Sequence, residues 1–264
     1  MMDSQLPMIQ GKRQISAVLI TYNVAGTIGP CLEALKKVCD DIVVLDSFST
    51  DGTVEICKKL GVRLVPQEWL GYSQTKNIGN QMAQHDWILS IDSDEVLSEE
   101  LIDTLNKVEL KNGQVYSLDR LTNFCGKWIY NSGWYPEWKV RMFNREEVKW
   151  QGDYVHETLD IPANFLTVKL NGKLFHYSYK DKEDHLNRIK KYARLSAQER
   201  FEKGKKASFT KMWLSPIARF FRTYFIKKGF LDGKEGFLIS WRSAYMVKLR
   251  YSILHDLWQK KETV

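Results

Sequence analysis

Two carboxylates one residue apart, Asp92 and Asp94, directly follow a short apolar run at residues 87–91. In an open α/β sheet, ligands bind at the carboxyl ends of the strands, so acids at the end of a buried strand are well placed to hold a cation. Mg²⁺ and Mn²⁺ take one or two protein carboxylates together with the oxygens of a bound diphosphate. The pair therefore indicates chemistry on a nucleotide-linked substrate. Alternatively, both acids only end a strand ahead of a helix that Ser98 caps.

The residues before this pair alternate short β-branched runs with helical patterns, which is typical of βαβ units and a parallel sheet. Strands are expected at residues 15–20, 41–46, 62–65 and 87–91. Three of the strand ends present Thr21 with Tyr22, Asp46, and the acidic pair. Because the carboxyl ends of parallel strands meet at one edge of a sheet, these side chains should face one crevice.

Two other phosphate-binding motifs are absent from the sequence. There is no Gly-x-x-x-x-Gly-Lys-Ser/Thr loop, and the turn after the first strand lacks the Gly-x-Gly-x-x-Gly pattern. These motifs place backbone N–H groups and a helix N-terminus against phosphates. Kinase-like and dehydrogenase functions therefore lose their main support.

Four motifs in order along the chain resemble the nucleotide-sugar domain of inverting glycosyltransferases of family 2, which have the GT-A fold. They are residues 18–23, 44–53, 76–79 and 92–95. Three further strings, at residues 140–143, 154–157 and 229–233, resemble the branch that includes the lipopolysaccharide inner-core β-glucosyltransferases. The resemblance implies an α/β GT-A fold, with a mixed, mainly parallel sheet flanked by helices and a C-terminal amphipathic helical extension.

The resemblance also implies roles at the donor site. Thr21, Tyr22 and Asp46 would hold the uridine base or ribose of a UDP-sugar. Asp92 would contact the ribose, the metal or metal-bound water. Asp94 would ligate the Mg²⁺ or Mn²⁺ ion that bridges the diphosphate.

Two cations and a general base complete the implied site. Lys76 stands where the family more often has Arg, so a point charge replaces a bidentate fork near the diphosphate. Arg141 would clamp the donor diphosphate or an acceptor phosphate, or else only decorate a strand. Glu157 is the predicted base that takes the proton of the acceptor hydroxyl, and His156 would orient it or reach the metal and diphosphate. Three other carboxylates stay open as the base: Asp153, Glu95 and Glu137.

Aromatic residues are dense between residues 123 and 150, with Gly126, Gly133 and Pro136 among them. Aromatic rings stack on the apolar faces of sugars, so this segment suggests a saccharide acceptor. Core packing is the alternative, and it is the stronger interpretation for Trp128 and Trp150.

The C-terminal third is basic and aromatic. The net charge of the 264 residues is +7, and its excess lies after Lys203. A helix over about residues 215–228, begun by Ser215-Pro216, would carry Phe220, Phe221, Tyr224 and Phe225 on one face. With a second helix over about residues 236–258, it could lie on an anionic membrane, or both could pack on the catalytic body.

The chain shows no export signal and no apolar run of the roughly 20 residues needed to span a bilayer, so we expect a cytoplasmic protein, peripheral on the inner face of the cell membrane. Its four cysteines form no Cys-x-x-Cys pair, which favours reduced thiols. The expected divisions are a leader at 1–14, a catalytic domain at 15–180 with halves 15–101 and 102–180, and a membrane-associating extension at 181–264.

The predicted function is metal-dependent transfer of a sugar, with UDP-glucose as the expected donor, to a lipopolysaccharide-core or other lipid-linked saccharide. A polyprenyl-phosphate acceptor is the first alternative, since an anionic acceptor needs no base. A catalytically silent protein that binds nucleotide sugars or membranes is the second. No nucleic-acid partner is expected.

Overall fold

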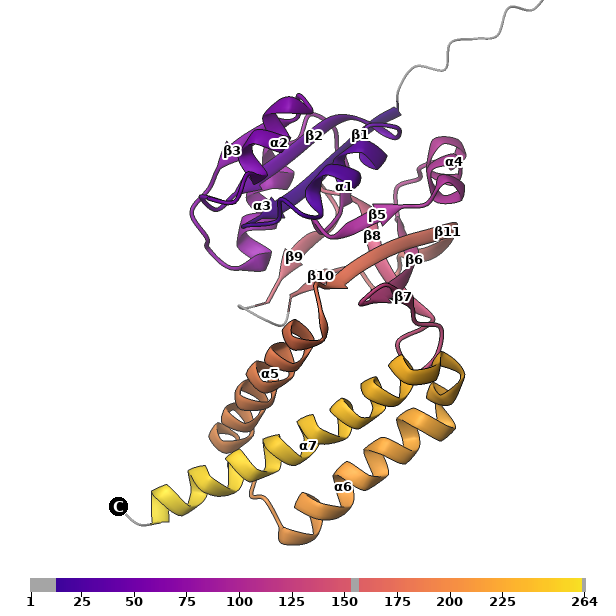
Figure 1. The fold of residues 1–264 in the computed structure, drawn as a ribbon. Helices are drawn as coiled ribbons and strands as arrows, with labels where there is room; N and C mark the ends of the chain where they lie inside the picture. Colours follow the sequence, from indigo (N-terminus) through magenta and orange to yellow (C-terminus); the bar gives the residue numbers. More distant parts are fainter. Residues whose placement is uncertain (1–12, 153–156, 263–264) are drawn as a thin grey trace, which may run out of the picture. The chain divides into compact units, whose positions relative to one another are not determined.

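The computed structural model describes residues 13–152 and 157–262, which form two compact units (Figure 1). The first consists of Met1–Arg120 and Trp138–Phe175, and the second of Leu121–Glu137 and His176–Val264. The division expected at residue 180 therefore differs from the observed one, because the segment at 121–137 clusters with the C-terminal helices. The predicted leader lies almost entirely outside the described residues.

Four strands build the N-terminal half of the first unit: β1 (Arg13–Thr21), β2 (Cys39–Asp46), β3 (Arg63–Pro66) and β4 (Trp87–Ser90). β1 pairs in parallel with β2 and with β4, and β2 pairs in parallel with β3. Each strand was predicted to within two residues, because its β-branched run is bounded by turn residues. In the register of β1 and β2, Thr21 lies opposite Asp46, so both strands end at one edge.

The remaining strands make the sheet mixed, as predicted. They are β5 (Glu95–Leu97), β6 (Gln114–Phe124), β7 (Lys127–Trp128), β8 (Glu137–Asn144), β9 (Lys149–Gln151), β10 (Thr158–Asp160) and β11 (Leu166–Tyr179). Among the described residues, the large sheet has the order β3-β2-β1-β4-β8-β6-β11-β5, with β7 on β6, while β9 and β10 form a separate pair. β8 runs antiparallel to β4. The side chains that follow β4 therefore lie beside those of β8.

Helices cover both faces of this sheet. α1 (Ile28–Leu35), α2 (Thr53–Lys59) and α4 (Glu99–Lys107) pack with Ala17 and Leu19 of β1, whereas α3 (Tyr72–Met82) packs over Val18, on the opposite face. Successive strand residues point to opposite faces, which explains this division. The Ser98 hydroxyl caps α4 by accepting a hydrogen bond from the Leu101 N–H, as predicted.

Gly79 lets α3 approach the sheet very closely. A Cβ atom at this position would lie 2.5 Å from Leu45 Cδ1 and 2.6 Å from Val18 Cγ1, closer than real Cβ contacts allow. A larger residue would therefore require either the helix or the side chains of Leu45 and Val18 to shift. The helix that carries Lys76 thus rests directly on β1 and β2.

The second unit is helical. It contains α5 (Lys182–Glu202), α6 (Phe209–Phe221), a π-helical turn η1 (Arg222–Ile226), a 3₁₀ turn η2 (Gly229–Asp232) and α7 (Gly233–Glu262). α6 and α5 both pack against α7 (Figure 1). The predicted start of α6 at Ser215-Pro216 was wrong, because Ser208 caps the helix by accepting from the Lys211 N–H and Pro216 lies inside it. Among the described residues, no helix is both long enough and apolar enough to cross a membrane.

Asp232 fastens the segment at 121–137 to the C-terminal helices. Its buried carboxylate accepts hydrogen bonds from the backbone N–H groups of Tyr130 and Asn131 and from the Ser132 hydroxyl, and its carbonyl oxygen accepts from Lys127. A buried carboxylate with several donors is strongly oriented. The Gly-Phe-Leu-Asp-Gly string at 229–233 therefore has a structural role within the second unit.

His185 makes the stability of the second unit sensitive to acid. Burial among the rings of Phe124 and Tyr179, together with the charge of Arg242, lowers the pKa of His185 from 6.5 to about 4. Because the unfolded chain takes up this proton at higher pH, stability should be constant above about pH 6.5 and should fall by up to about 1.4 kcal/mol per pH unit towards pH 4. Thermal melts across this range measure the slope. A His185→Gln variant with the same slope as the unaltered protein would contradict this assignment.

Candidate active site

The predicted donor-site residues lie at the carboxyl ends of β1, β2 and β4, within the first unit. The Ile91 N–H bonds the Val18 carbonyl oxygen, which carries the β1–β4 pairing to the residue before Asp92. On the other side of β1, the Thr21 hydroxyl donates to Asp46 Oδ1 over 3.0 Å. Thr21, Asp46 and Asp92 thus lie along one sheet edge, as the sequence predicted.

Asp46 organises the two loops that follow β1 and β2. It is 3% exposed and accepts hydrogen bonds from the Ser49 N–H and hydroxyl as well as from Thr21. The Ser49 hydroxyl in turn accepts from the Asn23 N–H. Asp46 therefore holds the loops in place, while Tyr22 on the first loop is exposed and available to a ligand.

Lys76 joins two of the predicted acids. Its ammonium lies 3.2 Å from Asp92 Oδ1 and 3.0 Å from Glu157 Oε1, and the side chain is only 2% exposed. The same ammonium lies 4.4 Å from the centroid of the Trp150 ring, a cation–π distance. The structure thus brings Glu157, from the second half of the catalytic body, to the acidic end of β4.

Only one of the two carboxylate oxygens of Glu157 has a hydrogen-bond partner among the described residues. One oxygen accepts from Lys76, whereas Oε2 is buried and has no hydrogen-bond partner among the described residues. Unlike Glu95, the Glu157 side chain is 27% exposed and has one carboxylate oxygen that binds no described residue, so this oxygen can accept a proton from a substrate hydroxyl.

Arg141, on β8, forms ion pairs with two of the acids in this cluster. One guanidinium nitrogen, Nη2, lies 2.5 Å from Asp92 Oδ2 and 2.6 Å from Glu95 Oε1. Burial alone would raise the pKa of Asp92, but the charges of Arg141 and Lys76 outweigh it and hold that pKa well below its ordinary value. Asp92 is therefore ionised at every working pH.

Glu95 positions these groups. It is fully buried, accepts from Arg120 and Arg141 through Oε1, and accepts the Asp92 N–H through Oε2. With both oxygens bound and no exposure, it is a poor general base. Its geometry instead fixes the backbone of Asp92 and the guanidinium of Arg141.

Asp94 lies in the turn between β4 and β5, where the Glu95 N–H donates to the Asp92 carbonyl oxygen over 2.9 Å. Burial first, and then the negative charges of Glu95, Asp94 and Asp92, raise the pKa of Cys31. Three acids thus gather at this turn. The described residues contain no group of three or more metal-ligating side chains around one point.

These oxygen donors fit a hard cation that keeps some waters. Mg²⁺ or Mn²⁺ needs only one or two protein carboxylates when a diphosphate supplies further oxygens. Asp94, which is half-buried, and Asp92, which is one-third exposed on its side chain, are the candidate ligands.

Two other candidate bases, Asp153 and Glu137, stay open. Asp153, together with His156, which was predicted to orient Glu157, falls in the segment 153–156, outside the described residues. Glu137 belongs to the second compact unit. Glu157 thus remains the predicted base.

Sequence reasoning missed two parts of this site. Arg120, on β6, donates to Glu95 and was not considered. Trp150 is 8% exposed and core-like, as expected, but it also carries the cation–π contact with Lys76. A lone arginine in a strand and a tryptophan near a strand end give no pattern that would have singled them out. Their partners lie 25 and 74 positions away along the chain.

Comparisons with known proteins identify the class. The model of glycosyl transferase family 2 matches residues 16–162, and the chain belongs to this family. The family model and the relatives named as glycosyltransferases show that the protein is an enzyme of the glycosyltransferase class, with a GT-A-like fold.

Three proteins to which the chain is similar illustrate the degree of sequence identity and coverage. An uncharacterized glycosyltransferase of Rickettsia prowazekii is 29% identical over 96% of this chain and 90% of its own length. The lipopolysaccharide core biosynthesis glycosyltransferase LpsC of Rhizobium meliloti is 24% identical over 92% of this chain and 94% of its own. The crystal structure of TarS 1-349 from S. aureus in complex with UDP-GlcNAc is 12% identical, with a TM-score of 0.42 over 94% of this chain and 92% of that one.

Proposed function

We propose that this protein is a metal-dependent inverting glycosyltransferase that moves a sugar from a UDP-sugar, with UDP-glucose as the first choice, to a saccharide hydroxyl. The observation that carries the proposal is the contact of Lys76 with both Asp92 and Glu157. It joins the acid at the end of a nucleotide-site strand to a second acid with a free oxygen.

The donor half of the site would work through Asp94, Asp92, Lys76 and Arg141. Asp94 and Asp92 would hold Mg²⁺ or Mn²⁺, which, when bound, offsets the charge that develops on the leaving UDP. Lys76 and Arg141 already carry positive charge at this point, with Arg141 held by Glu95. When the donor enters, both cations could also donate to diphosphate oxygens from their present positions, because Asp92 would then have the metal as a partner.

The acceptor half would work through Glu157. Direct displacement at the anomeric carbon requires that the attacking hydroxyl lose its proton as the new bond forms. Glu157 Oε2 would take this proton while Oε1 stays on Lys76. Attack from the face opposite UDP turns an α-linked donor into a β-linked product. A base at this place favours a hydroxyl acceptor over a polyprenyl phosphate, which would need none.

The acceptor class is proposed from the relatives. The name of the Rhizobium meliloti relative assigns it to lipopolysaccharide core biosynthesis. A lipopolysaccharide-core or other lipid-linked saccharide would fit such a site. The test is a panel of UDP- and GDP-sugars with Mn²⁺, with release of the nucleotide as the readout. Release from UDP-sugars supports the proposal, whereas release from no donor supports a catalytically silent binding protein.

A membrane-facing surface on the second unit would bring the enzyme to a lipid-linked acceptor. Along α6 and η1, exposed apolar side chains recur about every fourth residue: Leu214, Ile217, Phe221 and Phe225. Arg219, Arg222, Lys227 and Lys228 are exposed beside them. Phe220 and Tyr224, which were predicted to share this face, instead pack on Phe237, each with ring centroids 5.8 Å from it. The proposed partner is an anionic membrane surface on the cytoplasmic side.

Replacing Phe221 and Phe225 by Ser should release the protein from anionic vesicles without altering its thermal melt, because both rings are about half exposed. Each basic residue near the surface adds on the order of 1 kcal/mol, which salt screens, so binding should also weaken as ionic strength rises. Vesicle cosedimentation measures both effects. Leu166→Ser, at an apolar position on the first unit that is 64% exposed, serves as the control. Unchanged cosedimentation of the double variant would contradict the proposed surface.

A further inference from the structure

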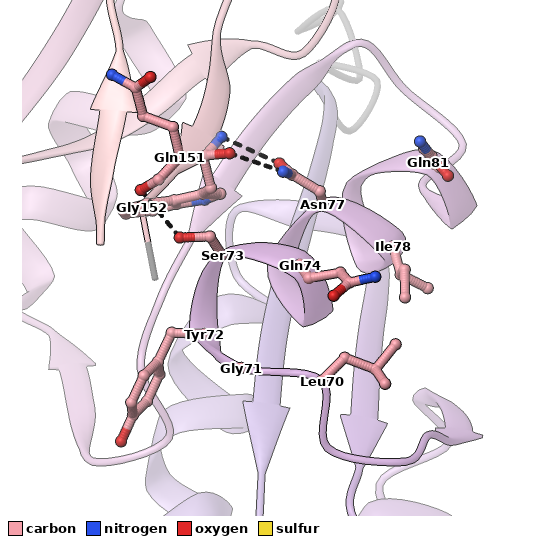
Figure 2. A pocket seen from close by; sticks show the side chains of 11 residues that line it. Leu70, Gly71, Tyr72, Ser73, Gln74, Asn77, Ile78, Gln81, Gln151 and Gly152 are labelled. Carbon is pink, nitrogen blue, oxygen red and sulfur yellow. Dashed lines mark hydrogen bonds between the residues drawn. The ribbon is translucent and has the colours of Figure 1, made fainter. Parts of the chain in front are cut away.

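A polar cavity of about 510 Å³ lies between the first turns of α3 and the end of β9, within the first unit. Figure 2 shows how it is built. Asn77 accepts the Trp150 N–H and donates to the Trp150 carbonyl oxygen, and the Ser73 hydroxyl donates to the Gln151 carbonyl oxygen. These three bonds fix the strand to the helix. The two elements that line the cavity, α3 and β9, are therefore held together by hydrogen bonds.

The side chains of α3 that line the cavity share one face of the helix. Gln74, Ile78 and Gln81 line the cavity from one face of α3, at positions i, i+4 and i+7. Gln151 lines it from β9. In the described part of the chain, the three glutamine side chains make no hydrogen bond with another residue, so their amide groups are available as donors and acceptors.

The chemistry of the lining selects the ligand. Among the described residues that line the cavity there is no Asp, Glu, Lys, Arg or His. The described lining residues themselves therefore offer no countercharge to a diphosphate or a phosphorylated headgroup. Amide groups beside the apolar surfaces of Leu70, Ile78 and Tyr72 suit a neutral molecule that is rich in hydroxyls.

The cavity adjoins the charged cluster through one side chain. Trp150 lines the cavity, and its ring centroid lies 4.4 Å from Lys76 Nζ. Its indole N–H is buried and has no hydrogen-bond partner within the described residues. Trp150 thus forms a wall that the cavity shares with the charged cluster.

We propose that this cavity binds a neutral sugar unit of the acceptor, next to the site of transfer. This inference rests on the proposed function and adds an acceptor subsite outside the donor and metal residues. The residues that would recognise the sugar are Gln74, Gln81 and Gln151, with Trp150 as the shared wall.

The test uses saturation-transfer NMR on the full chain in the presence of UDP and Mn²⁺. The probes are glucose, galactose, mannose and a manno-heptose, with galacturonate as the charged comparison. At least one neutral sugar should receive saturation from the unaltered protein, and uridine should not displace it. Gln74→Trp, which fills the cavity from an exposed position, should weaken binding at least about tenfold, and Gln151→Ala should weaken it in the same direction. Met82→Trp, on the same helix but outside the lining, is the matched control.

Failure of the proposed sugar subsite can be distinguished from failure of the proposed function. Binding of UDP is measured in parallel by calorimetry and should be equal in all three variants, because none of these residues belongs to the charged cluster. If the unaltered protein does not bind UDP, the proposed donor is wrong, but the sugar-binding experiment can still be interpreted. The subsite is overturned if no neutral sugar binds, if uridine displaces the sugar, or if Gln74→Trp binds as tightly as Met82→Trp.

Discussion

Glu157→Gln is expected to lower turnover by a factor of roughly 10² or more while leaving the affinity for UDP nearly unchanged. The amide keeps the size of the side chain and an oxygen that can accept from Lys76, whose ammonium lies 3.0 Å from the carboxylate. It loses only the capacity to take a proton. Because proton transfer belongs to the transfer step, the loss should fall on kcat and not on donor binding. Initial rates with the active UDP-sugar, beside calorimetry of UDP, measure both.

The matched control for this change is Glu146→Gln. Glu146 lies 11 positions earlier, is 72% exposed on its side chain and is paired only loosely with Arg145. It should retain full turnover. If Glu157→Gln also retained near-normal transfer, the base would have to be sought at Asp153 or Glu137. An acceptor that is already an anion would be the other explanation, and a panel with a polyprenyl phosphate would decide between them.

Asp94→Asn should weaken the binding of UDP in the presence of Mn²⁺ by at least about tenfold, since even the outer partners of metal ligands typically cost that much when removed. An amide is a poorer ligand for a hard cation and does not offset its charge. In EDTA, where UDP is held only by protein groups, the variant and the unaltered protein should bind alike. Calorimetry under the two conditions therefore isolates the metal-dependent part of donor binding.

Asp103→Asn provides the control, because Asp103 is exposed on α4, away from the strand ends. A loss of affinity that persists in EDTA would indicate a general disturbance of the turn at 92–95. Equal affinity in Mn²⁺ would remove Asp94 from the set of metal ligands and leave Asp92 as the only predicted one.

Local patterns were sufficient for the first half of the chain. β1 to β4 and the helices between them follow runs of β-branched residues and apolar helical spacing, and both signals lie within about ten neighbouring positions. α6 shows where such signals mislead. A Ser-Pro pair is common at a helix start, yet here Ser208 provides the cap and α6 includes Pro216. The link between Asp232 and residues 130–132 spans about 100 positions, and no local pattern could reveal it.

The sequence predicted which residues form the site better than it predicted the ion pairs and hydrogen bonds between them. Residue types at strand ends, together with the family resemblance, pointed to Asp92, Lys76, Arg141 and Glu157. The observed ion pairs join all four in one series, in which Lys76 bridges Glu157 and Asp92, and Asp92 also binds Arg141. The roles of Glu95 and Arg120 could not be predicted, because a positioning residue is defined by its partners and those come from separate strands. Metal ligation by Asp94 and Asp92 stays a prediction.

The close approach at Gly79 has an electrostatic consequence. α3 carries Lys76 three positions before Gly79 and has no clearance above β1 and β2. The backbone that carries the Lys76 ammonium is therefore held at a fixed distance from the strand ends. Reorganisation of charged groups is a large part of the barrier for such reactions in water, where solvent dipoles must turn as charge moves. Here the close packing of Gly79 on Leu45 and Val18 positions the helix that carries one of these charges already during folding, so that we expect less reorganisation to remain for the reaction.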